Sequence, residues 1–419
     1  MISAFSTALS GLNADSTAID VIGNDLANLN TTGYKATEMQ FSDLMSEQLG
    51  VSGTSGQLGM GIGQLSAQSE YTQGSLQTTN GPTDAAIQGN GFFVVQNQNA
   101  QTLYTRDGSF SVNSSGQLVD ATGDLVQGWS ATAGGSVNTN GAIGNISLPV
   151  GSTIAATPTT TMSLDVNLNA TPSSTTTPAT FSAPIQVVDS LGTDHTLTAT
   201  FTNTGANTWS YSVAIPASDL SQGGQTTVAT GNLTFNSSGQ LTTPDAASGP
   251  QTVNITGLAD GAADMSIGWN LFDPTTGASN ITQFAEASAV SNTTQNGFAA
   301  GQISSVSLQN GGLLVATYSN GQQVTAGQLA LAAISNPDSL TAVGNNDLAA
   351  SAQTAAPVVG TADTGSRGQI VAGALESSTV DIAQEFTQLL TFERSYQANS
   401  RVITTDDQLL QETINLVHS

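Results

Sequence analysis

The last 45 residues of the chain carry the pattern that most constrains its fold, an apolar side chain at every seventh position. A strict seven-residue repeat predicts a long helix that supercoils with other helices instead of packing on a sheet. A helix over this whole stretch would be about 65 Å long, so most of its apolar stripe is expected to meet other long helices. The repeat consists of Leu375, Ile382, Leu389, Tyr396, Ile403, Leu410 and Val417.

A second helix is expected at the N-terminus, from Ile2 to Leu29, because this stretch has no proline and only two glycines. Asn and Gly residues in 28–33 then favour a helix end. The seam loses its alternate positions at Ser16 and Gly23, so we expect the C-terminal helix to be the main rod. The apolar seam of the N-terminal helix consists of Ile2, Phe5, Leu9, Leu12, Ile19 and Leu26.

Between residues 75 and 360 the pattern changes to short apolar runs separated by Gly, Asn, Asp and Ser, which is typical of β-strands and turns. The predicted fold is therefore mainly β with long terminal α-helices. The two helices are expected to pair as a coiled-coil-like stalk, with nested, discontinuous β-domains between them. The predicted parts are a terminal helical domain (1–30 plus 374–419), a connecting segment (31–75 plus 360–373), an inner β-domain (76–150 plus 286–359) and an inserted outer β-domain (151–285).

The charge balance excludes several classes of partner. The chain has 5 basic and 30 acidic residues and a formal charge of -25, and the basic residues are scattered. Nucleic acid binding needs clustered Lys and Arg, and an anionic membrane surface is disfavoured for the same reason. No apolar run is long enough to span a bilayer, and no cleavable secretory signal is evident at the N-terminus. The chain has no cysteine, which is compatible with export to an oxidising exterior.

The sequence offers little catalytic chemistry. Its two histidines, His195 and His418, cannot be placed in a zinc or nucleophile motif from spacing. The segment 189–195 combines Asp, Ser and His, but closeness along a turn is no triad. We therefore predict no catalytic residue, no metal ligand and no cofactor, and expect that the chain is not an enzyme. A secreted β-rich adhesin or carbohydrate-active enzyme stays open as an alternative, because a glycosidase carboxylate pair has no fixed spacing.

Both ends of the chain resemble the flagellar axial family of rod, hook and hook-associated proteins. The segment 19–35 matches the N-terminal signature of that family, with Asp25 where Asn is usual, and 373–381 with 396–400 resembles its C-terminal signature, with Thr379 where Asn is usual. The signature residues are Gly23, Asn24, Leu26, Ala27, Asn28, Asn30, Thr31, Gly33, Tyr34, Lys35, Leu375, Glu376, Ser377, Val380, Asp381, Tyr396, Gln397, Ala398 and Asn399.

Within this family, the length of the chain and the room for an inserted domain favour the hook proteins over the shorter rod proteins, with a distal rod protein as the alternative. The resemblance implies a subunit of a helical homopolymer, a flexible tube that transmits torque from rod to filament. It also implies passage through the flagellar type III export apparatus, assembly under a hook cap scaffold, and contact with rod and hook–filament junction proteins. The implied location is the hook region of the flagellum.

Overall fold

A computed structural model describes residues 2–44, 47–49, 56–132, 134–148, 151, 153–171 and 178–417. The chain forms two compact units, the first made of 1–150, 305–317 and 323–419 and the second of 151–304 and 318–322. The first unit contains both long helices, which pack together, and within these described ranges every other regular element is a strand or a short 3-10 turn. This confirms the predicted fold class.

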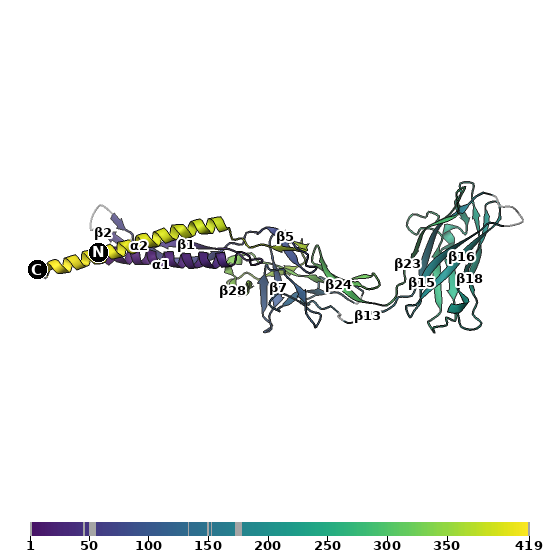
Figure 1. The fold of residues 1–419 in the computed structure, drawn as a ribbon, viewed down its shortest axis with the longest axis horizontal. Coiled ribbons are helices and arrows are strands. Elements are labelled where there is room, and N and C mark those ends of the chain that lie inside the picture. The colour runs from purple at the N-terminus through teal and green to yellow at the C-terminus, as the bar shows by residue number, and fades with distance from the viewer. Residues whose placement is uncertain are drawn as a thin grey trace. The chain divides into compact units, whose positions relative to one another are not determined.

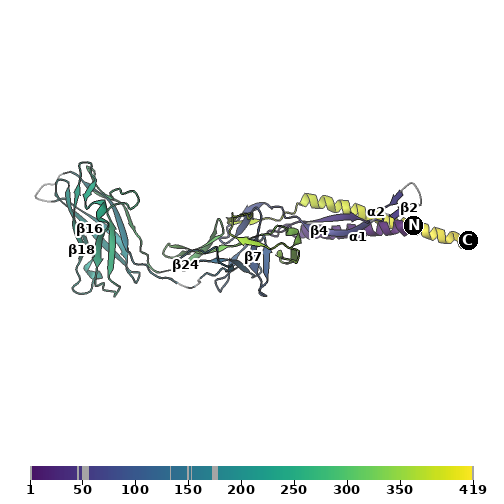
Figure 2. The ribbon, with the colours of Figure 1, turned by 180° about the vertical axis from the view of Figure 1, so that it is seen from behind.

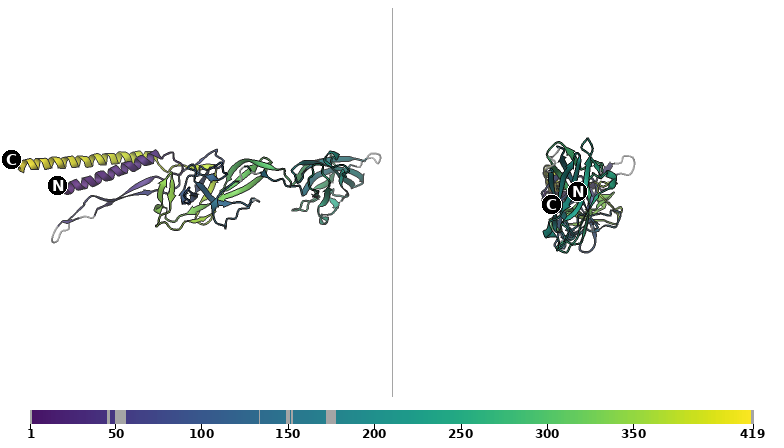
Figure 3. Two further views of the ribbon diagram at one scale, coloured as in Figure 1. Left: turned by 90° about the horizontal axis from the view of Figure 1, so that it is seen from below. Right: turned by 90° about the vertical axis from the view of Figure 1, so that its right-hand side faces the viewer.

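The two helices run antiparallel in the first unit, α1 from Ile2 to Ala27 and α2 from Ile382 to Val417 (Figure 1). The C-terminal end of α2 extends beyond the N-terminal end of α1 (Figure 3). The predicted extent of the N-terminal helix agrees with α1 to within two residues at its end.

The prediction that the C-terminal helix includes Leu375 was wrong. Leu375 lies in strand β32 (Ala374–Glu376) and pairs with Gln77. The helix begins later because the Asp381 carboxylate caps it, with Oδ1 accepting hydrogen bonds from the backbone N–H groups of Ala383 at 2.8 Å and Gln384 at 3.2 Å. The 36 residues of α2 give a length of about 54 Å, shorter than expected.

A β-ribbon occupies much of the predicted connecting segment. Strands β1 (Thr37–Asp43) and β4 (Ile62–Ser69) pair antiparallel, and β2 (Glu47–Leu49) pairs with β3 (Gly56–Leu58). The ribbon packs beside α1 (Figure 2). Its position is fixed in part by Ser10, whose Oγ accepts a hydrogen bond from the backbone N–H of Ile62 at 3.2 Å.

The rest of the first unit is a β-body whose largest sheet has a buried central strand. In that strand, β7, the residues from Phe92 to Val95 are buried. Successive side chains point to opposite faces of the sheet, so this continuous apolar run is buried on both faces. Two further antiparallel pairs are β5 with β32 and β6 with β31. They join the segment that enters the β-body after the ribbon to the segment that leaves the β-body for α2. The strands are β5 (Leu76–Thr78), β6 (Ala85–Gln88), β7 (Phe92–Gln96), β8 (Thr102–Thr105), β9 (Ser111–Val112), β10 (Leu118–Val119), β11 (Leu125–Ser130), β12 (Gly144–Asn145), β24 (Gly301–Gln309, which begins in the second unit), β25 (Leu313–Tyr318), β26 (Gln323–Leu329), β27 (Leu331–Ala333), β28 (Thr341–Gly344), β29 (Asp347–Ala349), β30 (Val358–Gly360), β31 (Gln369–Ala372) and β32 (Ala374–Glu376), with the 3-10 turn η3 (Pro337–Ser339).

The second unit is a β-sandwich. One sheet has the order β15-β16-β17-β18-β19 and the other β20-β21-β14-β22, with β23 also paired to β14. Their inner faces share one core, in which Tyr211 meets Trp269 edge-to-face with ring centroids 5.1 Å apart. The strands are β13 (Thr153–Ile154), β14 (Thr161–Asn169), β15 (Thr180–Val188), β16 (Asp194–Gly205), β17 (Thr208–Ala214), β18 (Thr227–Phe235), β19 (Leu241–Thr243), β20 (Gln251–Ile255), β21 (Met265–Asn270), β22 (Ile281–Phe284) and β23 (Ala289–Gln295), with the 3-10 turns η1 (Ala217–Asp219) and η2 (Ala246–Ser248).

The predicted outer domain ended too early, at 285. Strand β23 pairs with β14 from Met162 to Asn167, so the sandwich needs residues beyond 285, and the second unit continues to 304. Because β23 is mostly exposed and polar, a prediction based on the alternation of apolar residues does not detect it as a strand. The other predicted domain boundaries stay predictions.

Candidate assembly surface

Helix α1 buries mostly small side chains, and of its described large apolar residues Ile22 is buried whereas Phe5 and Leu9 are exposed. Its buried residues recur at intervals of three and four, which places them on one side of the helix. None of them belongs to the predicted seam. They are Ala8, Gly11, Ala14, Asp15, Ala18, Ile22 and Asp25.

Polar contacts join the two helices near the middle of α1. Asn399 of α2 donates a hydrogen bond from Nδ2 to Asp15 Oδ2 at 2.9 Å. A Cβ at Gly11 would lie 2.7 Å from the same Nδ2, so Gly11 leaves the space that Asn399 needs. Asp15 is buried, and this charge-assisted bond gives its carboxylate a partner.

None of the predicted seam residues with described side chains is buried. On α1, Phe5 and Leu9 are 38% and 41% exposed, and Leu12, Ile19 and Leu26 are half-buried. The side chain of Ile2 lies outside the described residues. Each of these seam residues therefore keeps part of its surface available for contacts beyond the chain.

The seam of α2 is similarly open. Ile382 is 46% exposed and Tyr396 38%, whereas Leu389 and Ile403 are half-buried. Exposed and half-buried positions therefore alternate along the seam, and none of those described is buried within the chain. Leu410, on the protruding end, is exposed again, and the side chain of Val417 lies outside the described residues.

Other large apolar side chains of α2 are exposed as well, and we name the whole set on both helices the outward apolar residues. A folded chain rarely leaves so many large apolar groups in water unless they meet a partner. The outward apolar residues are Phe5, Leu9, Ile382, Phe386, Leu390, Tyr396, Val402, Leu409, Leu410 and Ile414.

The β1–β4 ribbon adds exposed apolar side chains beside the helix pair, and the sequence-based prediction of the seam did not include them. The ring of Phe41 in β1 lies 5.7 Å from that of Phe392 in α2. Phe41 is still 41% exposed, and Met60 beside the ribbon is 44% exposed. The alternation of Met39 and Phe41 with polar residues was the available indication of a strand.

Several family signature residues meet where the helices join the β-body. The buried carboxylate of Glu376 contacts two cations, Lys35 Nζ at 2.6 Å and Arg106 Nη1 at 3.1 Å. Glu376 Oε1 also accepts a hydrogen bond from the backbone N–H of Gly74, and its backbone carbonyl accepts one from Gly33. Burial lowers the pKa of Lys35, although the Glu376 carboxylate opposes this shift.

Asp25 fixes the end of α1 to the same joint. Its Oδ1 accepts a hydrogen bond from the Tyr34 hydroxyl at 2.7 Å, and its Oδ2 accepts one from the backbone N–H of Thr37 at 2.8 Å. Burial raises the pKa of Asp25 despite these bonds. Burial, together with the nearby charges of Asp25 and Asp381, also raises the pKa of Glu385 at the start of α2.

The other signature residues divide into two groups. The Asn24 side chain donates a hydrogen bond to the Tyr34 hydroxyl at 2.9 Å, and the Thr31 hydroxyl donates one to Asn28 Oδ1 at 3.0 Å. The backbone N–H of Ser377 donates to the carbonyl of Ser75. These residues lie near the joint, as does the buried Val380. Thr379, the departure from the usual Asn, accepts a hydrogen bond from the backbone N–H of Ala36 at 2.8 Å. The signature residues Gly23, Ala27, Asn30, Gln397 and Ala398 are exposed.

The segment 189–195 does not form a catalytic triad. The Ser190 hydroxyl accepts a hydrogen bond from the backbone N–H of Ala263 at 2.9 Å, while His195 lies between Asp219 and Asp189, each at 3.1 Å. Burial would lower the pKa of His195, but these carboxylates outweigh that effect and raise it.

Among the described residues, neither helix has an apolar stretch long enough to cross a membrane.

Comparison with known families covers both ends and the middle of the chain. Family models match at 5–35 (flagella basal body rod protein), 86–168 (flagellar hook protein FlgE/F/G D1 domain), 152–298 (flagellar basal body protein FlaE D2 domain) and 371–416 (flagellar basal body rod FlgEFG protein C-terminal). The matched segments include most of α1, most of α2 and the sandwich.

Relatives named flagellar hook protein FlgE match almost end to end. The protein of Escherichia coli K12 is 33% identical over 423 residues, covering 99% of this chain and 100% of the relative. That of Salmonella typhimurium is 34% identical over 428 residues, covering 98% and 99%, and that of Treponema pallidum is 31% identical over 468 residues, covering 99% and 100%. The chain belongs to the family of flagellar hook proteins FlgE.

Proposed function

We infer that the chain is a structural subunit of the bacterial flagellar hook and that it polymerises through its terminal helices. The full-length similarity to hook proteins supports the first statement. The observation that carries the second is the set of outward apolar residues, ten large side chains that a single chain leaves in water. Burying each of them fully against neighbouring subunits would contribute on the order of 1 to 3 kcal/mol.

The arrangement of the first unit suits this role. The small side chains of α1 allow α2 to approach closely, so the large side chains of both helices point to the sides where copies of the chain can pack. The joint around Glu376 attaches the helices to the β-body through buried, charge-assisted contacts. In this proposal the helices form the inner tube, and the β-units form outer layers whose contacts shift as the hook bends and transmits torque.

Further partners follow from membership of the family and are part of the proposal. The first subunits would contact the rod, the last ones the hook–filament junction proteins, and addition would take place under a hook cap scaffold. Delivery would use the flagellar type III export apparatus. The family is structural, and catalysis plays no part in this account.

Electron microscopy of a strain lacking the gene tests the assignment. We expect cells that retain the rod but lack hook and filament, and restoration of both by the gene on a plasmid. Loss of the distal rod in the same cells would instead assign the chain to the rod, and normal hooks would overturn the proposal.

A further inference from the structure

The second unit has an unusual charge composition. Residues 151–304 and 318–322 contain nine carboxylates and neither lysine nor arginine, so His195 is the one side chain in this unit that can carry a positive charge. Three of the nine carboxylates, those of Asp189, Asp219 and Asp260, lie around His195. Even a protonated imidazole leaves two negative charges uncompensated at this place.

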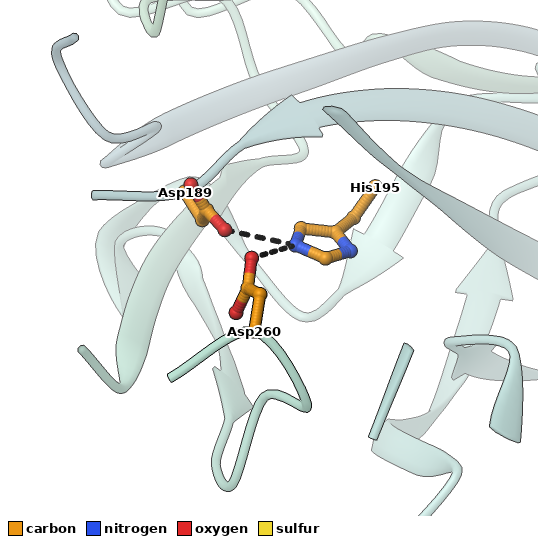
Figure 4. Close-up of side chains that lie close together, drawn as sticks. All are labelled: Asp189, His195 and Asp260. Carbon is orange, nitrogen blue, oxygen red and sulfur yellow. Dashed lines mark hydrogen bonds and ion pairs between the residues drawn. The ribbon is translucent and has the colours of Figure 1, made fainter. Parts of the chain in front are cut away.

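Two of these carboxylates converge on the same nitrogen. His195 Nε2 lies 3.1 Å from Asp189 Oδ2 and 3.9 Å from Asp260 Oδ2, and the three ligand atoms all lie within 4.8 Å of one another. The side chains point toward one another from separate segments (Figure 4). One N–H group can donate a good hydrogen bond to Asp189, but at 3.9 Å it cannot do so to Asp260.

The separations suit a bound cation. Zinc binds imidazole nitrogen and carboxylate oxygen at about 2.0–2.2 Å, and a tetrahedral arrangement then separates its ligand atoms by about 3.3–3.5 Å. The two distances from Nε2 lie on either side of this value, so shifts of less than about 1 Å would bring these ligands to it. An imidazole ligand favours zinc and similar transition metals over calcium and magnesium, which prefer oxygen.

The groups around the three ligands already hold them in place. Asp189 Oδ1 accepts hydrogen bonds from the backbone N–H groups of Leu191 and Thr193, both at 2.8 Å, which leaves Oδ2 directed at His195. Asp219 Oδ2 lies 3.1 Å from Nδ1, the carboxylate contact that commonly orients a metal-bound histidine. With Nδ1–H donating to Asp219, the lone pair of Nε2 faces the two carboxylates.

Asp260 lies on the loop between β20 and β21, and this loop is fastened on both sides of it. The backbone N–H of Ala259 donates to the carbonyl of Asp219 at 3.0 Å, and that of Ala263 donates to Ser190 Oγ at 2.9 Å. The side chain of Asp260 is 27% exposed, compared with 5% for His195 and 0% for Asp189. The site therefore has one ligand open to solvent, through which an ion can enter.

We propose that Asp189, His195 and Asp260 form a binding site for a divalent transition-metal ion such as Zn²⁺, which links the two sheets of the sandwich, with Asp219 orienting the histidine. Asp189 directly follows β15 and His195 lies in β16, both of one sheet, whereas Asp260 lies on the loop between β20 and β21 of the other sheet. Water occupies the remaining coordination position. On binding, the Nε2 lone pair is donated to the metal, and the proton of an imidazolium at that position is released to solvent.

Titration of the monomeric full-length chain, without a histidine tag, with zinc chloride tests the site. We expect one zinc ion per chain, measured by isothermal titration calorimetry. The Asp260→Asn variant keeps the hydrogen bonds of His195 and is expected to lose at least about tenfold in affinity, and Asp219→Asn to lose about 10- to 100-fold. The matched control is Asp194→Asn, which removes an exposed carboxylate next to His195 and should bind like the parent chain. Circular dichroism verifies that each variant is folded.

Three results would overturn the site. The first is no saturable zinc binding by the folded parent chain. The second is equal binding by the parent chain, Asp260→Asn and His195→Gln, which would place the zinc elsewhere. The third is calcium binding as tight as zinc binding, which would contradict the contribution of the imidazole. The experiment uses unassembled monomer, so its outcome is independent of the proposed role in the hook.

Discussion

At the scale of single residues, the joint between helices and β-body depends on Glu376. Its carboxylate is fully buried and is shared by Lys35 and Arg106. Removing one member of a buried ionic cluster leaves charges without compensation, which typically costs 3 to 5 kcal/mol. The Glu376→Gln variant should lower the free energy of unfolding by about that amount, measured by urea denaturation followed by circular dichroism. The exposed Glu70→Gln serves as control and should change it by less than about 0.5 kcal/mol. Equal midpoints for both variants would contradict the assigned role.

Asp347 predicts a dependence of stability on pH. Burial raises the pKa of Asp347 to about 7, and the nearby charges of Asp120 and Asp124 add to the shift. The folded chain then keeps a proton that the unfolded chain has already lost. The stabilisation is full below the unfolded pKa near 3.8 and is lost as the pH rises through about 7.

The Asp347→Asn variant isolates this contribution. Between pH 4 and pH 8, the parent chain should lose on the order of 2 to 4 kcal/mol more stability than the variant. Urea denaturation at a series of pH values measures the difference. Parallel curves for the two proteins would show that Asp347 titrates normally in the folded state.

At the residue level, the sequence can indicate local contacts but not contacts between distant segments. Lys35 and Glu376 were both named as signature residues, but their ion pair joins segments at opposite ends of the chain, which no periodicity reveals. The proposed metal site presents the same difficulty, since Asp260 approaches His195 only after two sheets pack together. Several His or Cys ligands at short spacing would indicate a zinc site, and the sequence contains none.

At the scale of elements, both helices were predictable because long apolar periodicity without proline is a strong local preference. The side on which they pack was not predictable. The pattern drew attention to large residues such as Leu9, whereas the contact within the chain uses small ones such as Ala14 and Ala18. The start of α2 was misplaced because Leu375 fits the repeat, and only the cap at Asp381 shows where the helix begins.

The unassembled helices should be the most vulnerable elements of the chain. The outward apolar residues lack partners in the monomer, and the end of α2 extends beyond α1, so this end has the fewest contacts to hold it folded. Limited proteolysis of the monomer with mass spectrometry of the fragments should therefore cut α2 first near its C-terminal end, before either β-unit. Terminal helices as resistant as the sandwich would speak against an assembly surface that is completed only in the polymer.

At the scale of the whole molecule, the nested order of the chain follows from its two ends. Because α1 and α2 pack together, everything between them must leave the helix pair and return to it. This was predictable from two terminal helices alone. The extent of the sandwich was not, because β23 has an exposed, polar pattern and is recognised as a strand only through its pairing with β14.

The central claim is that subunits assemble through the outward apolar residues, and electron microscopy of hooks in a complemented deletion strain tests it most directly. Leu390→Asp places a charge on a side chain that is 53% exposed in α2, and Leu191→Asp makes the same change at a 61% exposed leucine in the second unit. We expect Leu390→Asp cells to lack hooks while the purified variant stays folded, and Leu191→Asp cells to assemble hooks. Normal hooks from Leu390→Asp would contradict the account.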